Sequence, residues 1–204
     1  MAGYLVPPTK NPGDVLTSSL WNSYIRDNLD FGMVRPIADQ VLGIAAASID
    51  FTSIPATFAH LMVEIYAAGD TAAPSISVLV RLNNDSSAIY SGETFSAVHA
   101  TLVGLGYLNA AQLTIAAMPA ATGPGVNHRG AALLFIPNYA QPSGNKSVLG
   151  FSYYENADTV AGQGLYHVGG IWKSAAAINR LTLLPGAGNF VASSRATLYG
   201  MGGI

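Results

Sequence analysis

The sequence predicts a mainly β protein: an antiparallel, jelly-roll-like β-sandwich with an N-terminal extended arm and one short helix. From about residue 42 onward, short runs rich in β-branched and aromatic residues follow one another, with Gly, Pro and Asn clusters between them. No amphipathic helical pattern separates these runs, so the strands lack crossover helices and should pair in antiparallel fashion. We therefore divide the chain into an attachment arm, residues 1–41, and a sandwich domain, residues 42–204.

The composition narrows the class of protein further. Half of the 204 residues are hydrophobic and only 10% are charged, against roughly a quarter in an average soluble domain. The net charge of −2 argues against a strongly basic nucleic-acid-binding protein. The chain has no cysteine, which excludes a disulfide framework, a thiolate zinc site and a cysteine nucleophile.

Neither an export signal nor a membrane anchor is expected. The first ten residues lack the basic region followed by an apolar core that marks a signal peptide. No apolar run approaches the roughly 20 residues that a membrane helix needs. We expect a chain made in the cytoplasm, without a membrane partner.

The arm combines an extended lead-in with a helix over about residues 17–30. Pro7, Pro8 and Pro12 favour extended backbone, and Thr17 is a suitable N-cap. One apolar stripe follows at helical spacing: Leu20, Trp21, Tyr24, Ile25 and Leu29. A helix of about three turns is marginal alone, so the stripe must dock. It docks either on the chain's own sandwich or on a neighbouring subunit or partner protein.

The sandwich is predicted from about ten short strands. The first alternates loosely through Ile49, Phe51 and Ile54. The others are residues 60–66, 76–82, 95–103, 113–118, 131–136, 147–154, 165–172, 179–184 and 196–199. Turn signals lie at residues 83–85, 123–125, 142–145 and 185–189. A set of strands this dense closes as a sandwich, and a jelly roll is the favoured topology.

No catalytic or metal-binding motif is present. The histidines show no i, i+4 spacing; they are His60, His99, His128 and His167. A glycosidase needs two carboxylates facing each other, and nothing in the sequence pairs the candidates Glu64, Glu93, Glu155 and Asp158. The glycine-rich turns lack a complete phosphate-loop pattern. We expect no enzyme activity, metal or cofactor.

Aromatic residues offer an alternative, sugar-binding role. Four of them gather in one stretch of the predicted sheet: Tyr153, Tyr154, Tyr166 and Trp172. Such side chains stack on sugar rings but also fill cores and subunit interfaces. Because Tyr153 and Tyr154 are adjacent, they face opposite sides of a regular strand.

Several segments carry a resemblance to a known family. They are residues 48–55 with 58–61, residues 80–85 with their Asn-x-Asp turn, residues 136–140, residues 178–190 and residues 194–200. These segments resemble small bacteriophage virion structural proteins, of the tail- or fibre-associated or capsid-decoration type. The arm helix is similar to segments near the starts of phage tail and fibre proteins. The resemblance implies a β-sandwich incorporated in a virion and carries over no catalytic residue.

The resemblance and the composition together define the expected function. Little charge and abundant Ala and Gly allow close subunit contact. We expect a non-enzymatic virion component that binds other virion proteins through its arm and forms a homo-oligomer, with a trimer favoured. The alternative is a host-receptor or carbohydrate-binding module of a phage tail, which would bind a host surface glycan.

Overall fold

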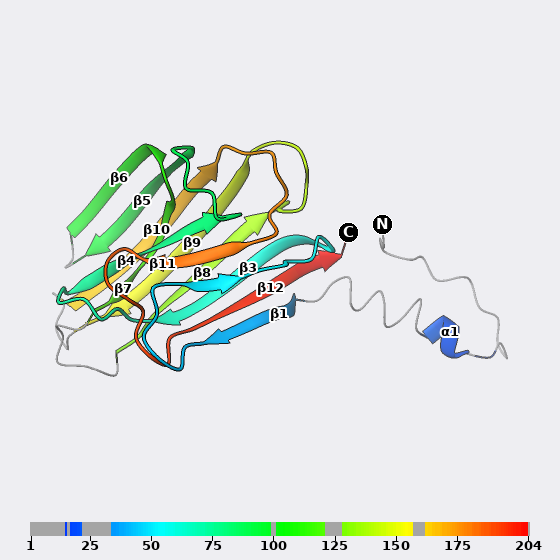
Figure 1. The fold of residues 1–204 in the computed structure, drawn as a ribbon, viewed down its shortest axis with the longest axis horizontal. Coiled ribbons are helices and arrows are strands. Elements are labelled where there is room, and N and C mark those ends of the chain that lie inside the picture. Colours follow the sequence, from blue (N-terminus) through cyan, green and yellow to red (C-terminus); the bar gives the residue numbers. More distant parts are fainter. Residues whose placement is uncertain are drawn as a thin grey trace.

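The computed structural model describes residue 15 and residues 17–21, 34–98, 101–120, 128–156 and 162–203. Within these ranges almost all regular structure is antiparallel β-sheet (Figure 1). The strands are β1 (Val34–Val41), β2 (Ile49–Phe51), β3 (Phe58–Ala67), β4 (Ser75–Leu82), β5 (Tyr90–Val98), β6 (Thr101–Ala110), β7 (Leu113–Pro119), β8 (Gly130–Pro137), β9 (Lys146–Glu155), β10 (Gln163–Trp172), β11 (Leu181–Pro185) and β12 (Arg195–Gly203).

The strand order is that of a jelly roll with two insertions. One sheet has eight strands in the order β1-β12-β3-β8-β9-β10-β5-β6, and the other has four in the order β2-β11-β4-β7. Without β5, β6, β9 and β10, the remaining eight strands form two four-stranded sheets in the orders β1-β12-β3-β8 and β2-β11-β4-β7, which is the arrangement of a jelly roll. The inserted strands β5–β6 and β9–β10 lie side by side and extend the larger sheet. The predicted antiparallel, jelly-roll-like sandwich is confirmed.

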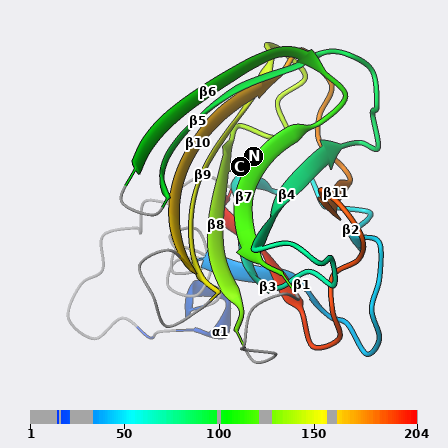
Figure 2. The ribbon, with the colours of Figure 1, turned by 90° about the vertical axis from the view of Figure 1, so that its left-hand side faces the viewer.

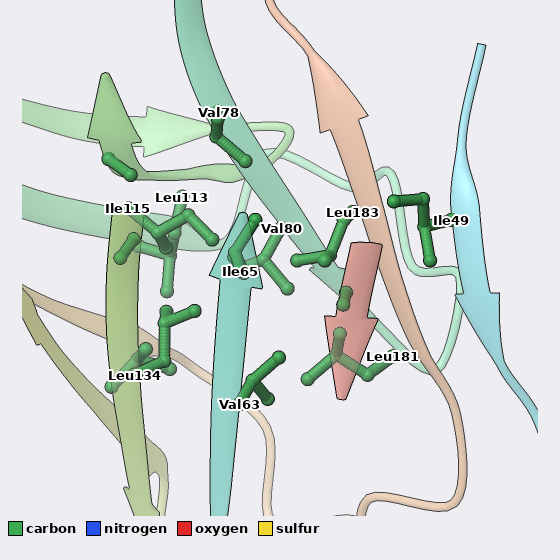
Figure 3. Packing of buried hydrophobic residues seen from close by; sticks show 14 of the residues in the cluster. Ile49, Val63, Ile65, Val78, Val80, Leu113, Ile115, Leu134, Leu181 and Leu183 are labelled. Carbon is green, nitrogen blue, oxygen red and sulfur yellow. The ribbon is translucent and has the colours of Figure 1, made fainter. Parts of the chain in front are cut away.

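The core lies between the two sheets. Period-two alternation along β3 buries Leu61, Val63 and Ile65 completely. These side chains face those of the smaller sheet, such as Val80 and Leu181, which are equally buried (Figure 3). Burial of each such side chain stabilises the fold by about 1.5–3 kcal/mol.

The larger sheet curves around β7, the edge strand of the smaller sheet (Figure 2). The backbone N–H of Ala117 on β7 donates to the Ser152 hydroxyl on β9 at 3.2 Å, and that of Thr114 donates to the Tyr107 hydroxyl on β6 at 2.8 Å. A Cβ atom added at Gly170 on β10 would lie 2.6 Å from the Leu113 side chain of β7. Close contact with β7 therefore holds the inserted strands in place.

Two predicted boundaries are wrong. The sequence places residues 34–41 in the arm, but they form β1 and pair with β12 over Val34–Met201 to Val41–Arg195. The sequence does not predict this strand, because it contains Arg35, Pro36 and Asp39, and proline and charged residues are typical of linkers as well as of sheet edges. The predicted strand 95–103 instead spans the ends of two strands, β5 and β6, which pair as a hairpin.

The structure does not show the predicted helix over residues 17–30. Its helical part is α1 (Ser18–Leu20), a single turn that the Trp21 N–H extends by donating to the Thr17 carbonyl at 2.9 Å. Residues 22–33 lie outside the described ranges. No helix in the described part of the chain has the length and apolar character needed to span a membrane.

Candidate functional site

The larger sheet has an outer face that turns away from the smaller sheet. On β8 the side chains of Ala132, Leu134 and Ile136 point into the core, so Leu133 and Phe135 point outward. On β9 the buried residues include Val148 and Tyr154, and the intervening positions point outward in the same way. Apolar residues therefore occupy both faces of these strands, although the core accounts for only one face.

Seven large apolar side chains on the outer face are between 43% and 68% exposed. We define them as the outer patch: Tyr66, Phe95, Leu102, Leu149, Phe151, Tyr153 and Leu165. They come from β3, β5, β6, β9 and β10. Since the larger sheet curves around β7 (Figure 2), the outer patch lies on its convex side.

The strand register makes the outer patch continuous. Phe151 on β9 lies opposite Leu133 on β8 and opposite His167 on β10. His167 in turn lies opposite Phe95 on β5. The rings of Phe151 and His167 are 6.4 Å apart. Aromatic and apolar side chains therefore lie side by side across four neighbouring strands, at the positions of cross-strand pairs.

A groove of about 540 Å³ runs along the outer patch. Its walls include Glu93, Phe95 and Phe151, and two glycines, Gly104 and Gly169, leave it open. A Cβ atom added at Gly169 would meet only the Leu149 side chain, at 3.9 Å, and one added at Gly104 would meet nothing within 4 Å. The groove therefore exists because two outward positions carry no side chain.

Polar groups border the outer patch on the side of β1, β12 and β3. Arg195 forms an ion pair with Asp39 at 2.7 Å, and the Thr197 hydroxyl donates to the same carboxylate at 2.8 Å. These hydrogen bonds, with that from Arg195 contributing most, lower the pKa of Asp39. The Tyr199 hydroxyl donates to Glu64 at 3.2 Å. The outer face thus divides into an apolar part and a polar border whose groups are already paired.

The four aromatic residues predicted as a sugar-binding surface do not share one face. Tyr153 is 45% exposed on the outer face, whereas Tyr154 and Trp172 are 3% and 2% exposed on the opposite face. Tyr166 stacks on Tyr154 with ring centroids 6.2 Å apart, and burial raises its pKa to about 12. Tyr153 and Tyr154 face opposite sides, as expected, and alternation along β9 and β10 also turns Tyr166 and Trp172 inward, so of the four only Tyr153 lies on the outer face.

The candidate carboxylates are far apart. Glu64 on β3 and Glu93 on β5 are separated by β8, β9 and β10, a distance of about 19 Å at the usual strand spacing. Glu155 lies two strands from each and is displaced along the register. Glycosidase pairs are about 5–9.5 Å apart. Asp158 lies outside the described residues.

The described histidines serve structural contacts. The backbone N–H of Asn138 donates to His60 Nδ1 at 3.2 Å, and His128 Nδ1 lies 3.0 Å from the Glu155 carbonyl oxygen. His99 lies outside the described ranges. Within those ranges, no three His, Asp or Glu side chains gather closely enough to hold a metal ion.

Of the five predicted arm residues, the structure describes the side chain of one. Trp21 is 50% exposed. The side chain of Leu20 and the residues Tyr24, Ile25 and Leu29 lie outside the described part of the chain.

Sequence reasoning missed the outer patch, although a signal was present. In residues 147–154 the apolar residues Leu149, Phe151 and Tyr153 alternate with Val148 and Tyr154, so both faces of the strand are apolar. A strand in a two-layer sandwich needs only one apolar face. Apolar residues on both faces therefore indicate a second contact.

Comparison of the chain with protein-family models, with curated proteins and with solved structures finds no match.

Proposed function

We propose that this chain is a non-enzymatic structural component of a bacteriophage virion, in which the jelly-roll body is displayed and buries its outer patch against protein. The observation that carries the proposal is the outer patch itself. An apolar surface of this extent marks an interaction site far more often than it occurs on an unpartnered monomer. The low charge of the chain fits a subunit whose surface is covered by other protein.

The polar groups of the described residues support a structural role over a catalytic one. The candidate glutamates are too far apart to act as a pair. The turn after β4 is satisfied internally, since Trp172 Nε1 donates to the Asp85 carboxylate at 3.0 Å and the Ser87 N–H donates to it at 2.9 Å. The Asp85 carboxylate therefore stabilises the turn.

The arm supplies the proposed attachment. Its apolar stripe is too short to be stable alone in water, and Trp21 is half exposed. Docking on another virion protein would bury it. The proposal covers both a capsid decoration or cement protein and a tail or fibre protein, assembled as a homo-oligomer with a trimer favoured.

Mass spectrometry of purified virions from the source that encodes the chain tests this function. We expect the chain at a constant ratio to the major structural proteins, and we expect gold-labelled antibodies against the sandwich to mark intact particles. An abundant host protein measured in parallel controls for contamination. If the amount of the chain decreases in parallel with that of the host protein during purification, the virion role is refuted.

A further inference from the structure

We propose that the outer patch is the surface through which copies of this chain bind one another. The inference rests on the proposed assembly role and adds to it the surface and the partner, a second copy of the same chain. Four features of the described residues support it: the area of the outer patch, the arrangement of its residues, the charge of the surface and the edge strand β6 beside it.

The area is close to what a stable contact needs. Half of an aromatic or leucine side chain amounts to roughly 100 Å². The seven residues of the outer patch are each about half exposed, so together they present roughly 600–700 Å² of apolar surface. A standard interface buries about 800 Å² on each partner. The outer patch and its immediate border therefore make an interface of ordinary size.

The arrangement is that of an interface centre with a polar rim. Interface centres are enriched in aromatic residues and depleted of charge, while their rims are polar. Here Phe95, Phe151 and Tyr153 occupy the apolar part. The Asp39–Arg195 ion pair lies at the border.

The charge favours a second copy over a foreign protein. Charge is sparse on the outer face: the groove contains one carboxylate, Glu93, and Glu64 faces the same side opposite Leu133. Specificity for a foreign partner commonly uses complementary charge, and this surface offers few charges for it. Two identical copies meet with little charge to desolvate, and closed symmetry then buries the outer patch of every copy.

The two edge strands of the larger sheet, β1 and β6, differ in how well they are protected against pairing with another strand. The edge strand β1 carries Arg35, Pro36 and Asp39 and a register shift, which are devices that prevent edge-to-edge pairing. The opposite edge strand, β6, has no charge and no proline, and its Leu108 is 76% exposed. Since β6 also contributes Leu102 to the outer patch, a contact that covers the outer patch extends to this unprotected edge.

Sedimentation equilibrium of the full chain tests the proposal. We expect the wild type to form an oligomer at micromolar concentration. Phe151→Glu places a charge at the centre of the outer patch, and Gly169→Glu fills the groove without removing an apolar group. A Cβ atom added at Gly169 meets nothing closer than 3.9 Å, and the new carboxylate faces Glu93 across an open, solvent-filled groove, so the second variant should fold even if the first does not.

Both variants should weaken association by roughly 30-fold or more, the effect of losing one hot-spot contact, and shift the mass toward the 21.1 kDa monomer. Ile44→Glu is the matched control, since Ile44 is 79% exposed and lies between β1 and β2. It should leave the oligomer intact. Circular dichroism and thermal melting check that each variant is folded.

A monomeric wild type would overturn the proposal, and so would a folded Gly169→Glu variant that keeps the wild-type oligomer. Either result would leave the virion role standing if the chain still copurifies with particles. Conversely, an oligomer sensitive to Gly169→Glu but absent from particles would support self-association and refute the virion role.

Discussion

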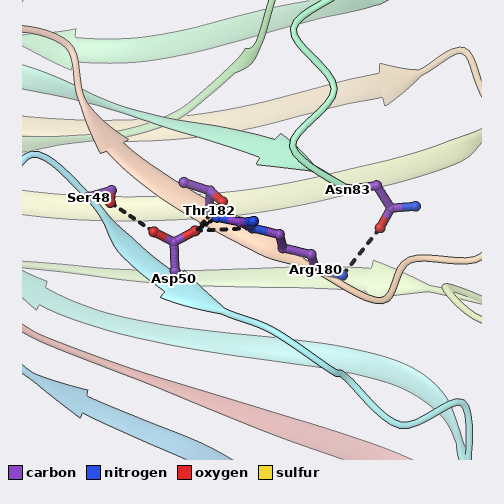
Figure 4. A network of polar contacts seen from close by, with 5 residues as sticks. All are labelled: Ser48, Asp50, Asn83, Arg180 and Thr182. Atoms are coloured by element: carbon purple, nitrogen blue, oxygen red, sulfur yellow. Dashed lines mark hydrogen bonds and ion pairs between the residues drawn. The ribbon is translucent and has the colours of Figure 1, made fainter.

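At the scale of single residues, Asp50 joins two segments that are distant in sequence, residues 48–50 and 180–182. Its carboxylate accepts hydrogen bonds from the Ser48 hydroxyl at 2.8 Å and the Thr182 hydroxyl at 2.6 Å, and forms an ion pair with Arg180 at 2.7 Å (Figure 4). Asn83, in the left-handed conformation at φ 52°, accepts a hydrogen bond from the Arg180 N–H. Residues 48–50, 83 and 180–182 thus meet in one structural network.

This network makes stability depend on pH through Asp50. Burial alone would raise the pKa of Asp50, but hydrogen bonds from Thr182, Arg180 and Ser48 together lower it below its usual value. A carboxylate with a lowered folded-state pKa stabilises the fold above the unfolded-state pKa of about 3.9, and this contribution is lost as the pH falls through the folded-state pKa.

Asp50→Asn should therefore lower the free energy of unfolding at pH 7 by about 1 kcal/mol, a modest value because the pair is partly exposed. Urea denaturation at pH 7 and at pH 3 measures the effect, and the difference from wild type should shrink at the lower pH. Asp39→Asn is the control: its ion pair with Arg195 has the same length but is more exposed, so the loss should be smaller. An equal loss at both pH values would show that the charge of Asp50 is not involved.

At the scale of elements, β1 belongs to the sandwich and not to the arm. It pairs with β12 along its whole length, and the Leu42 N–H just after it donates to the Ser194 carbonyl at 2.9 Å. Most of its side chains are exposed. Its contribution to stability thus comes mainly from the backbone ladder and from the partly buried Ile37 and Ala38.

Two truncations test this boundary. A chain of residues 34–204 should melt at the temperature of the full chain. A chain of residues 42–204 leaves β12 unpaired on one side, and its melting temperature should fall by about 5–10 °C, since 1 kcal/mol corresponds to about 2–4 °C in a domain of this size. Thermal melting followed by circular dichroism measures both. Equal melting temperatures of the two truncated chains would show that residues 34–41 do not stabilise the sandwich and belong to the arm.

The sequence allowed the class and topology to be predicted because they depend on local patterns. Residues 60–66 and 76–82 alternate with period two and end at turns, and the structure places β3 and β4 there. The edges escaped prediction: β1 contains a proline and charges, and β6 contains Gly104 and Gly106 without regular alternation.

The candidate site depended on the register, which the sequence does not reveal. The outer patch arises because Phe151 lies opposite His167, which in turn lies opposite Phe95 on the next strand. The predicted sugar-binding group failed for the related reason that closeness along β9 and β10 does not place side chains on one face. The sequence shows that residues 147–154 carry apolar side chains on both faces of the strand. Only the position of the smaller sheet shows which of these two faces is buried in the core and which is exposed.

At the scale of the whole molecule, attachment through the arm and the stability of the sandwich should depend on different residues. Trp21 is half exposed, so Trp21→Ala should leave the melting temperature of the isolated protein unchanged. If the arm docks on a virion protein, the same substitution should reduce incorporation into particles at least tenfold, because about 1.4 kcal/mol of lost contact already has that effect. Thermal melting and quantitative mass spectrometry of purified particles give the two readouts. A lower melting temperature with normal incorporation would show that the arm packs on its own sandwich.

In the assembled state, the outer patch should be covered by protein. Hydroxyl-radical footprinting read by mass spectrometry measures the exposure of single side chains in the assembled wild type and in the monomeric Gly169→Glu variant. Oxidation of Phe95, Phe151 and Tyr153 should be several-fold slower in the assembled wild type, while oxidation of Ile44 should be the same in both. Equal oxidation of the three aromatic residues in the two samples would show that the outer patch is not covered.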